Sequence, residues 1–268
     1  MILLGIFGLL MIFTGEVLSF FPVLPWAQHV FSFFWYGYIL VLDSLNYQLR
    51  GTSLLFGRQR EFLLMLPISA AYWYVFEWYN LVIENWVYLN APTEIWIEIT
   101  MKIVSFATVI PAIYETADLL SAILPTGKGL QVRSLIPSNW HGISLTLGLL
   151  LSILPLLLPK FFFWSVWLGL FCLIDPINDR LRRPSILSDL HSGDLRRTTI
   201  FLLAGYVCGF FWEFWNFWAY TKWIYTVPVP EMPHIFEMPM LGFLGFGPFG
   251  LETFAFWTLI WGRGKNVN

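Results

Sequence analysis

Four glutamates lie in apolar, aromatic stretches of the sequence, where ionisable side chains are unusual. They are Glu77, Glu115, Glu213 and Glu252. Burial away from water favours the neutral form of a carboxyl group, and a neutral carboxylic acid can act as a general acid. The four glutamates are therefore the candidate catalytic residues, and the expected chemistry is the transfer of a proton.

The residues around these glutamates occur in the same order twice. The second copy contains Trp212-Glu213-Phe214-Trp215-Asn216, Trp223-x-Tyr225 and Pro248-x-x-x-Glu252-Thr253, and the first, about 136 positions earlier, contains Phe76-Glu77-Trp78-Tyr79-Asn80, Trp86-x-Tyr88 and Pro111-x-x-x-Glu115-Thr116. Such repetition is typical of a chain built from duplicated structural units.

The polar and aromatic members of the two copies are the candidate substrate-binding residues: Asn80, Trp86, Tyr88, Trp212, Asn216, Trp223 and Tyr225. The faces of aromatic rings attract cations, so a wall of these rings could stabilise a carbocation. The alternative for the two Trp-x-Tyr pairs is anchoring in the aromatic belt at the membrane–water interface. For the glutamates and asparagines, the alternative is interhelical hydrogen bonding that only holds a helix bundle together.

The composition predicts that these residues are positioned by membrane-spanning helices. The chain of 268 residues is 57% hydrophobic and 12% charged, about half the charge of a typical soluble domain. Open strands cannot satisfy their backbone groups in hydrocarbon, so we expect an all-α polytopic membrane protein with about eight transmembrane helices. The apolar runs lie at about 2–22, 28–47, 61–82, 96–124, 142–158, 161–178, 198–220 and 238–262.

Further matches extend the duplication to four helices in each half. Asp43-x-x-Asn46 matches Asp175-x-x-Asn178, and Ser53 matches Ser185. We therefore predict a first four-helix repeat at 1–124, a linker at 125–141 and a second four-helix repeat at 142–268. Because four is an even number, the two tandem repeats have the same orientation and are related by an axis along the membrane normal.

The basic residues predict the orientation of the chain. Twelve of the 15 would lie on one side of the membrane if eight helices alternate in direction. Cytoplasmic loops are enriched in Lys and Arg, so both termini are expected in the cytoplasm and the protein in the cell (cytoplasmic) membrane. The first apolar run lacks a basic flank and a cleavage site, which favours a retained span over a signal peptide.

Several classes of function find no support in the sequence. The net charge of −2 gives no indication of nucleic-acid binding. The four histidines show no metal-binding spacing, and no cofactor fingerprint occurs, so no metal and no cofactor are predicted. The glycine-rich stretch 242–248 lacks the ending of a phosphate loop, and we interpret it as a site of close helix packing or a broken helix.

The repeated pattern resembles the lycopene cyclase domain of the integral-membrane carotenoid cyclases. The resemblance rests on Trp212-Glu213, Trp223-x-Tyr225 and Pro248 with Glu252, and on their counterparts in the first half. The family more often has Asp after Trp, a tighter Pro-x-Glu-Glu spacing and three helices per unit.

This resemblance implies cofactor-independent cyclisation or isomerisation of a polyene or isoprenoid lipid. A protonated glutamate would donate to a terminal double bond, aromatic faces would hold the cation, and a carboxylate would remove a proton. Glu252 or Glu213 would be the acid, with Glu115 and Glu77 as counterparts.

Two other functions remain open on the sequence. The carboxyl groups could form the relay of a proton- or cation-coupled transporter, which requires a hydrated path. Alternatively, the protein could be a non-catalytic membrane scaffold or lipid-binding subunit, in which changing the four glutamates to glutamine would have little effect. In each case the predicted environment is the lipid bilayer.

Overall fold

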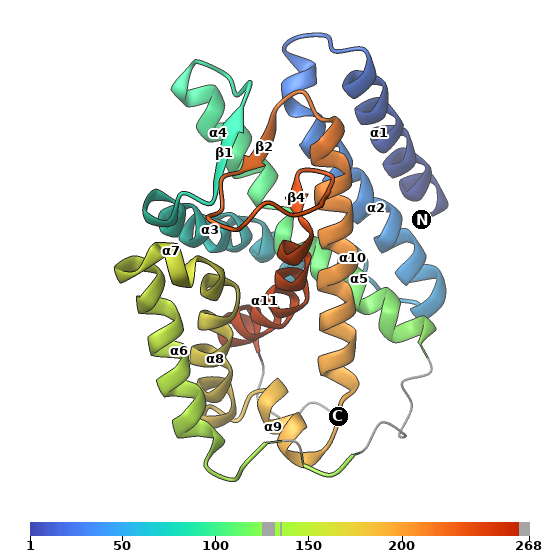
Figure 1. Ribbon diagram of the computed structural model, residues 1–268. Helices are drawn as coiled ribbons and strands as arrows, with labels where there is room; N and C mark the ends of the chain where they lie inside the picture. Colours follow the sequence, from blue (N-terminus) through green and yellow to red (C-terminus); the bar gives the residue numbers. More distant parts are fainter. Residues whose placement is uncertain (125–131, 135, 263–268) are drawn as a thin grey trace. The chain divides into compact units, whose positions relative to one another are not determined.

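A computed structural model describes residues 1–124, 132–134 and 136–262 of the chain. The protein is mostly helical (74%) and divides into two compact units (Figure 1). Unit 1 comprises Met1–Ala122 and Cys208–Met240, and unit 2 comprises Ile123–Val207 and Leu241–Asn268. These units are defined by spatial contacts, whereas the predicted halves are defined by repetition in the sequence. The predicted repeat boundaries therefore remain a prediction, and 125–131 and 135 of the predicted linker lie outside the described residues.

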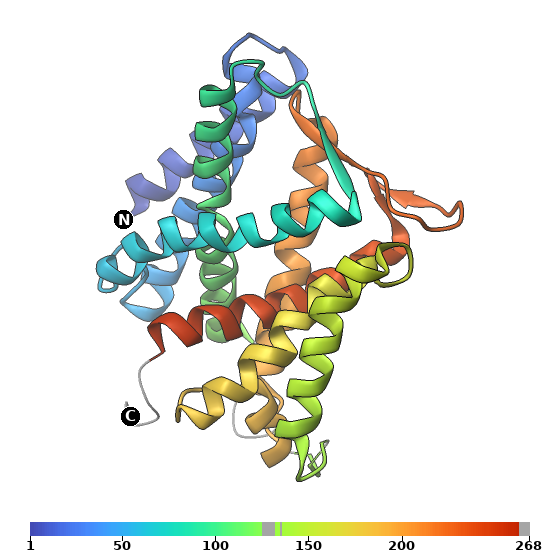
Figure 2. The same ribbon diagram turned by 90° about the vertical axis from the view of Figure 1, so that its left-hand side faces the viewer.

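Unit 1 contains the helices of the first half together with the end of one later helix. Its elements are α1 (Ile2–Phe20), η1 (Trp26–His29), α2 (Val30–Arg50), α3 (Gln59–Ile83), β1 (Trp86–Leu89), α4 (Ile95–Phe106), α5 (Val109–Ile123), the last part of α10 (Arg196–Trp218), β2 (Lys222–Tyr225), β3 (His234–Ile235) and β4 (Met238–Pro239). Within this unit the axis of α3 crosses the axes of α4 and α5 at a large angle (Figure 2).

Unit 2 contains the remaining helices. Its elements are α6 (Trp140–Leu157), α7 (Pro159–Phe162), η2 (Phe163–Ser165), α8 (Val166–Arg180), α9 (Ile186–Ser192), the first part of α10, η3 (Met240–Gly245) and α11 (Phe246–Trp261). Residues 242–245 of the glycine-rich stretch lie in the 3₁₀ segment η3, and residues 246–248 begin α11, so the helix type changes within this stretch. Gly250 of α11 packs closely on α10, where an added Cβ would lie 3.0 Å from the Cα of Gly205.

Six helical segments of the described chain are long and apolar enough to cross a membrane. They are Ile2–Phe20, Ile95–Ile123, Trp140–Leu157, Pro159–Arg180, Arg196–Trp218 and Met240–Trp261. The protein is therefore a multi-pass helical membrane protein. The two other predicted spans coincide with α2 and α3, which are long helices but are absent from this set. The full count of eight spans remains a prediction.

Glycines permit close packing of α1 on α2 and of α6 on α8. A Cβ added to Gly8 would lie 2.6 Å from the carbonyl oxygen of Gly37, and one added to Gly37 would lie 2.6 Å from that of Gly8. In unit 2, a Cβ added to Gly169 would lie 2.8 Å from the Ser152 hydroxyl oxygen. Membrane helices commonly associate through small residues in this way, which explains the position of these glycines in otherwise bulky apolar runs.

Candidate functional site

The two Trp-x-Tyr segments pair with each other as an antiparallel ribbon in unit 1 (Figure 1). Trp86 lies opposite Tyr225 and Tyr88 lies opposite Trp223, with Val87 opposite Ile224 between them. Successive side chains of a strand point to opposite faces. All four aromatic residues of the two segments therefore lie on one face of the ribbon.

Glu213 of α10 bonds to this aromatic face through one of its two carboxyl oxygens. The Tyr225 hydroxyl donates to Oε1 of Glu213 at 2.6 Å, and the Trp223 indole donates in turn to the Tyr225 hydroxyl at 2.9 Å. The Glu213 side chain is completely buried, and its Oε2 has no hydrogen-bond partner among the described residues. One oxygen of this carboxyl group is thus fixed and the other is available.

Glu77 of α3 has more donors than Glu213. Its Oε1 accepts hydrogen bonds from the Tyr88 hydroxyl at 2.7 Å and from the indoles of Trp73 at 3.1 Å and Trp86 at 3.2 Å. An ionised carboxylate is an acceptor only, and several donors directed at it suit that form. The two glutamates thus differ in hydrogen bonding, although their neighbouring residues are alike.

The two tyrosines of the ribbon are held in the neutral, donating form. Burial raises the pKa of Tyr88 well above its ordinary value, and the nearby Glu77 carboxylate raises it further. Burial and then the Glu213 carboxylate likewise raise the pKa of Tyr225. Each phenol therefore remains a hydrogen-bond donor to its glutamate at neutral pH.

Asn80 and Asn216 connect the ends of their helices to the ribbon. The Asn80 side chain donates to the Trp86 carbonyl oxygen at 2.8 Å, and its Oδ1 accepts from the Trp86 amide at 3.2 Å. The Asn216 side chain makes the same pair of bonds to the backbone of Trp223, at 2.8 and 2.9 Å. These amides position the ribbon, and their contact with a substrate stays a prediction.

Trp212 lies within a network of aromatic rings in unit 1. Its ring centroid is 5.1 Å from that of Trp35 and 6.4 Å from that of Trp73. Trp35 is completely buried, and its indole nitrogen has no hydrogen-bond partner in the described part of the chain. The network continues to the ribbon through Phe31, whose ring centroid is 5.3 Å from that of Trp223.

Glu115 lies in a separate buried cluster of unit 1. The Asn46 side chain donates to its Oε2 at 2.5 Å and to its backbone carbonyl oxygen at 2.9 Å. Asp43 lies within electrostatic range of the same carboxyl group, whose Oε1 has no hydrogen-bond partner among the described residues. Asp43 itself accepts from the Ser53 hydroxyl at 3.0 Å and the Leu55 amide at 2.8 Å.

Glu252 belongs to unit 2, where it is completely buried in α11. Neither of its carboxyl oxygens has a hydrogen-bond partner among the described residues. Nine of the eleven predicted site residues therefore gather around the ribbon of unit 1. Glu115 is hydrogen-bonded to Asn46 in the same unit, and Glu252 belongs to unit 2.

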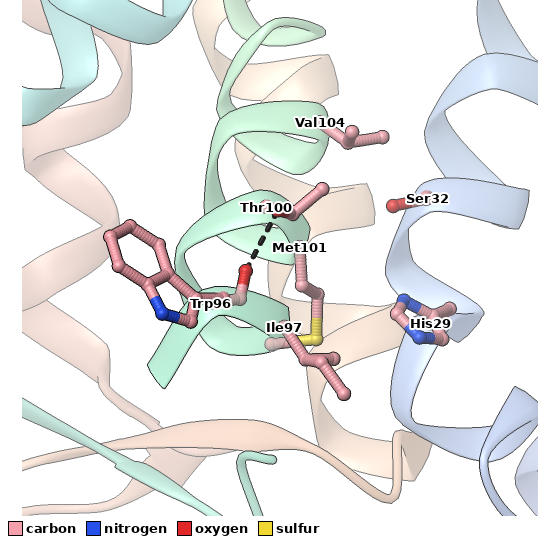
Figure 3. A pocket seen from close by; sticks show the side chains of 7 residues that line it. All are labelled: His29, Ser32, Trp96, Ile97, Thr100, Met101 and Val104. Atoms are coloured by element: carbon pink, nitrogen blue, oxygen red, sulfur yellow. Dashed lines mark hydrogen bonds between the residues drawn. The ribbon is translucent and has the colours of Figure 1, made fainter. Parts of the chain in front are cut away.

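A groove of about 400 Å³ lies between the start of α2 and α4 in unit 1 (Figure 3). Its lining is mainly apolar and consists of His29, Ser32, Trp96, Ile97, Thr100, Met101 and Val104. The side chains of Ser32 and His29 point toward Val104 and Met101 across the gap (Figure 3). Phe31 and Lys102, which are next to the lining residues Ser32 and Met101 in the sequence, contact the ribbon: the Phe31 ring centroid is 5.3 Å from that of Trp223, and the Lys102 ammonium group is 4.8 Å from the Tyr88 ring centroid.

Sequence reasoning missed three aromatic contributors to this site, namely Trp73, Trp35 and Phe31. The spacing of Trp73 and Glu77, one helical turn apart, could have indicated their contact. Trp35 and Phe31 lie in a different helix, and no local pattern places them beside the ribbon.

Within the described ranges, no group of three or more His, Cys, Asp or Glu side chains could hold a metal ion. No family model, curated protein or solved structure matches the chain.

Proposed function

We propose that this protein isomerises or cyclises a polyene or another isoprenoid lipid by proton transfer, without a cofactor. The observation that carries the proposal is the state of Glu213. Its carboxyl group is buried, is fixed at Oε1 by Tyr225 and has an available Oε2, within a network of aromatic rings. The closed, aromatic character of these surroundings favours chemistry on an apolar substrate.

The reaction would begin when Glu213 gives its proton to one carbon of a double bond, which leaves a cation on the substrate. The rings of Trp212, Trp223 and their neighbours would stabilise this cation through their faces. A neighbouring carbon would then lose a proton to the Glu77 carboxylate and form a new double bond. The substrate gains one proton and loses one, so no oxidant or reductant is needed. Excluding water protects the cation from capture.

The groove beside α4 would be the route by which a substrate approaches from the bilayer. It lies on a helical segment apolar enough to span the membrane, and its lining residue Ser32 follows Phe31, a member of the aromatic network, in the sequence. A polyene chain is apolar along its length, which suits a mainly apolar groove. The expected partners are therefore the lipid bilayer and a hydrophobic substrate dissolved in it.

The proposed topology is eight transmembrane helices in two tandem four-helix repeats of the same orientation. Three similarities support it. Gly37 and Gly169 both pack closely on the preceding long helix, and Asp43 and Asp175 both accept from a serine ten residues later. In the ribbon, Val87 pairs with Ile224, so a two-fold axis through this pair would exchange the two Trp-x-Tyr segments. The proposed location is the cell membrane, with both termini in the cytoplasm.

The proposal is tested in bacterial cells that accumulate lycopene as the available polyene. The wild-type protein should produce a new isomeric pigment, detected by chromatography of the extracts. Glu213→Gln should abolish it, because glutamine keeps the shape of the side chain but has no acidic proton. Glu231→Gln, at an exposed loop position, is the matched control and should retain activity. Unchanged lycopene in cells that contain folded wild-type protein would contradict the proposal for this substrate.

Proton-coupled transport is the second candidate function. The observation in its favour is the number of buried carboxyl groups outside the ribbon, namely Asp43, Glu115, Asp175 and Glu252. A transporter would acidify or alkalinise the lumen of vesicles when its substrate is added. The same purified protein can be tested for this with a pH-sensitive dye, and a scaffold would give neither a new pigment nor a dye signal.

A further inference from the structure

Glu252 and Glu115 occupy corresponding positions in the two sequence halves, yet their surroundings differ. Both side chains are completely buried. The Glu115 carboxyl group accepts from Asn46 at Oε2, and only its Oε1 lacks a partner among the described residues. Both oxygens of Glu252, in contrast, lack a partner among the described residues. One oxygen of the first glutamate is therefore held by a neighbour, whereas neither oxygen of the second is.

The position of one asparagine accounts for this difference. Asn46, on α2, donates to both the side chain and the backbone of Glu115. Asn178, its counterpart on α8, donates at 2.9 Å to the carbonyl oxygen of Ala255, three residues after Glu252 in α11. The Oδ1 atoms of Asn178 and Asn46 are both buried without a partner among the described residues. The Asn178–Glu252 pair therefore has three unpartnered oxygens, and the Asn46–Glu115 pair has two.

No charged neighbour described in unit 2 compensates an ionised Glu252. On α8, the carboxylate of Asp175 accepts hydrogen bonds from the Ser185 hydroxyl at 2.6 Å and from two backbone amides. Cys172, on the same helix, is a thiol within electrostatic range of Glu252. Arg183 donates to the backbone oxygens of Thr258 and Leu259. On α10, Arg197 pairs with Asp189, and the Tyr206 ring packs against Gly247.

Electrostatics then determines the form of the Glu252 side chain. A buried carboxylate with neither a cation nor hydrogen-bond donors costs far more free energy than a buried neutral acid, so such a group takes up a proton. A neutral carboxylic acid has one O–H donor.

We propose that Glu252 is a proton-binding site that holds a single proton in the folded protein, and that Glu115 is a structural carboxyl group. This inference does not depend on the chemistry proposed for Glu213, since it rests on residues of unit 2 and requires no organic substrate. The site would serve equally as a proton reserve for a membrane enzyme and as the carrier site of a proton-coupled transporter. Its ligand is the proton and not a metal cation.

Infrared spectroscopy of the purified protein in lipid tests this inference, because the carbonyl stretch of a carboxylic acid is separate from the bands of a carboxylate. A carbonyl that accepts no hydrogen bond also absorbs at a higher frequency than one that does. The wild type should show a high-frequency acid band that moves on transfer to heavy water. Glu252→Gln should remove this band, and Glu252→Asp, which keeps a carboxyl group, should shift it.

The controls separate the alternatives. Glu115→Gln and Glu231→Gln should leave the high-frequency band in place. Loss of the band in Glu115→Gln, or an unchanged band in Glu252→Gln, would overturn the inference. Addition of sodium at constant pH should have no effect, and a band that disappears with sodium would identify a cation site instead. Failure of the lycopene assay would not affect any of these outcomes, so the two proposals can be judged separately.

Discussion

Tyr88 lies directly opposite Trp223 in the β1–β2 ribbon, although the two residues belong to distant parts of the sequence. The register brings the tyrosine of one Trp-x-Tyr segment beside the tryptophan of the other. Each tyrosine hydroxyl then reaches the glutamate of its own half, Glu77 or Glu213. The ribbon thus joins two similar carboxyl–phenol pairs into a single site.

The first prediction concerns the two tyrosine hydroxyls. Tyr225→Phe removes the donor to Glu213 Oε1 and the acceptor of the Trp223 indole, and a buried group left without its partner costs about 1–3 kcal/mol. Tyr88→Phe should destabilise less, because Glu77 Oε1 keeps the indole donors of Trp73 and Trp86. Thermal unfolding of both variants in one detergent measures the difference. Equal losses, or a larger loss for Tyr88→Phe, would contradict the described hydrogen bonding.

The second prediction concerns alkaline pH. Burial and the adjacent glutamates raise the pKa of Tyr88 and Tyr225 in the folded protein. A raised pKa contributes stability that is fully present below the unfolded value of about 10 and is lost as the pH rises through the folded value.

The wild type should therefore lose stability above about pH 10 more steeply than the double variant Tyr88→Phe/Tyr225→Phe. Unfolding temperatures measured in a series of alkaline buffers give the two slopes. Parallel curves for the two proteins would show that these phenols do not titrate differently on folding.

The third prediction compares two buried aspartates that hold loops. Asp175 accepts from the Ser185 hydroxyl and from two backbone amides, whereas Asp43 accepts from the Ser53 hydroxyl and one amide. Replacing either with asparagine directs an NH₂ group at one or more donors, and each donor left unsatisfied costs about 1–3 kcal/mol. Asp175→Asn should lower the unfolding temperature more than Asp43→Asn. The reverse order would contradict the hydrogen bonds described here.

The fourth prediction concerns the orientation in the membrane. In a background of Cys172→Ser and Cys208→Ala, single cysteines are introduced at the exposed positions Arg60 and Thr93. Thr93→Cys should react with a membrane-impermeant maleimide in intact cells, and Arg60→Cys only after the cells are permeabilised. Labelling of Arg60→Cys from outside would place the basic loops on the external face and reverse the proposed topology.

The sequence predicted the helices better than it predicted the ribbon. The apolar runs at about 61–82 and 198–220 match α3 and α10 closely, because a continuous apolar run of about 20 residues is a local signal. The sequence assigns each Trp-x-Tyr segment to an aromatic wall or to the aromatic belt and gives it no secondary structure. Each segment forms a strand, whose hydrogen-bond partners come from the other half of the chain, and four residues are too few for a recognisable alternation.

The candidate residues were predicted by type, but their partners were not. The pattern identified Glu213, Tyr225 and Asn216 as members of one site, and the structure brings them together in unit 1. It also treated Glu115 and Glu252 as equivalent. Their hydrogen bonding differs because Asn46 and Asn178 donate to different atoms, and such a difference depends on packing that identical motifs do not specify.

The fifth prediction tests proton transfer itself. Purified protein in lipid vesicles is incubated with lycopene in heavy water, and the product is analysed by mass spectrometry. Because the proposed acid exchanges its proton with solvent before donating it to carbon, the isomeric product should contain one deuterium that is absent from the remaining substrate. Glu213→Gln should give no product, and Glu231→Gln should give the labelled product at the wild-type rate. An isomer that contains no deuterium, or one formed equally by Glu213→Gln, would contradict proton transfer from this carboxyl group.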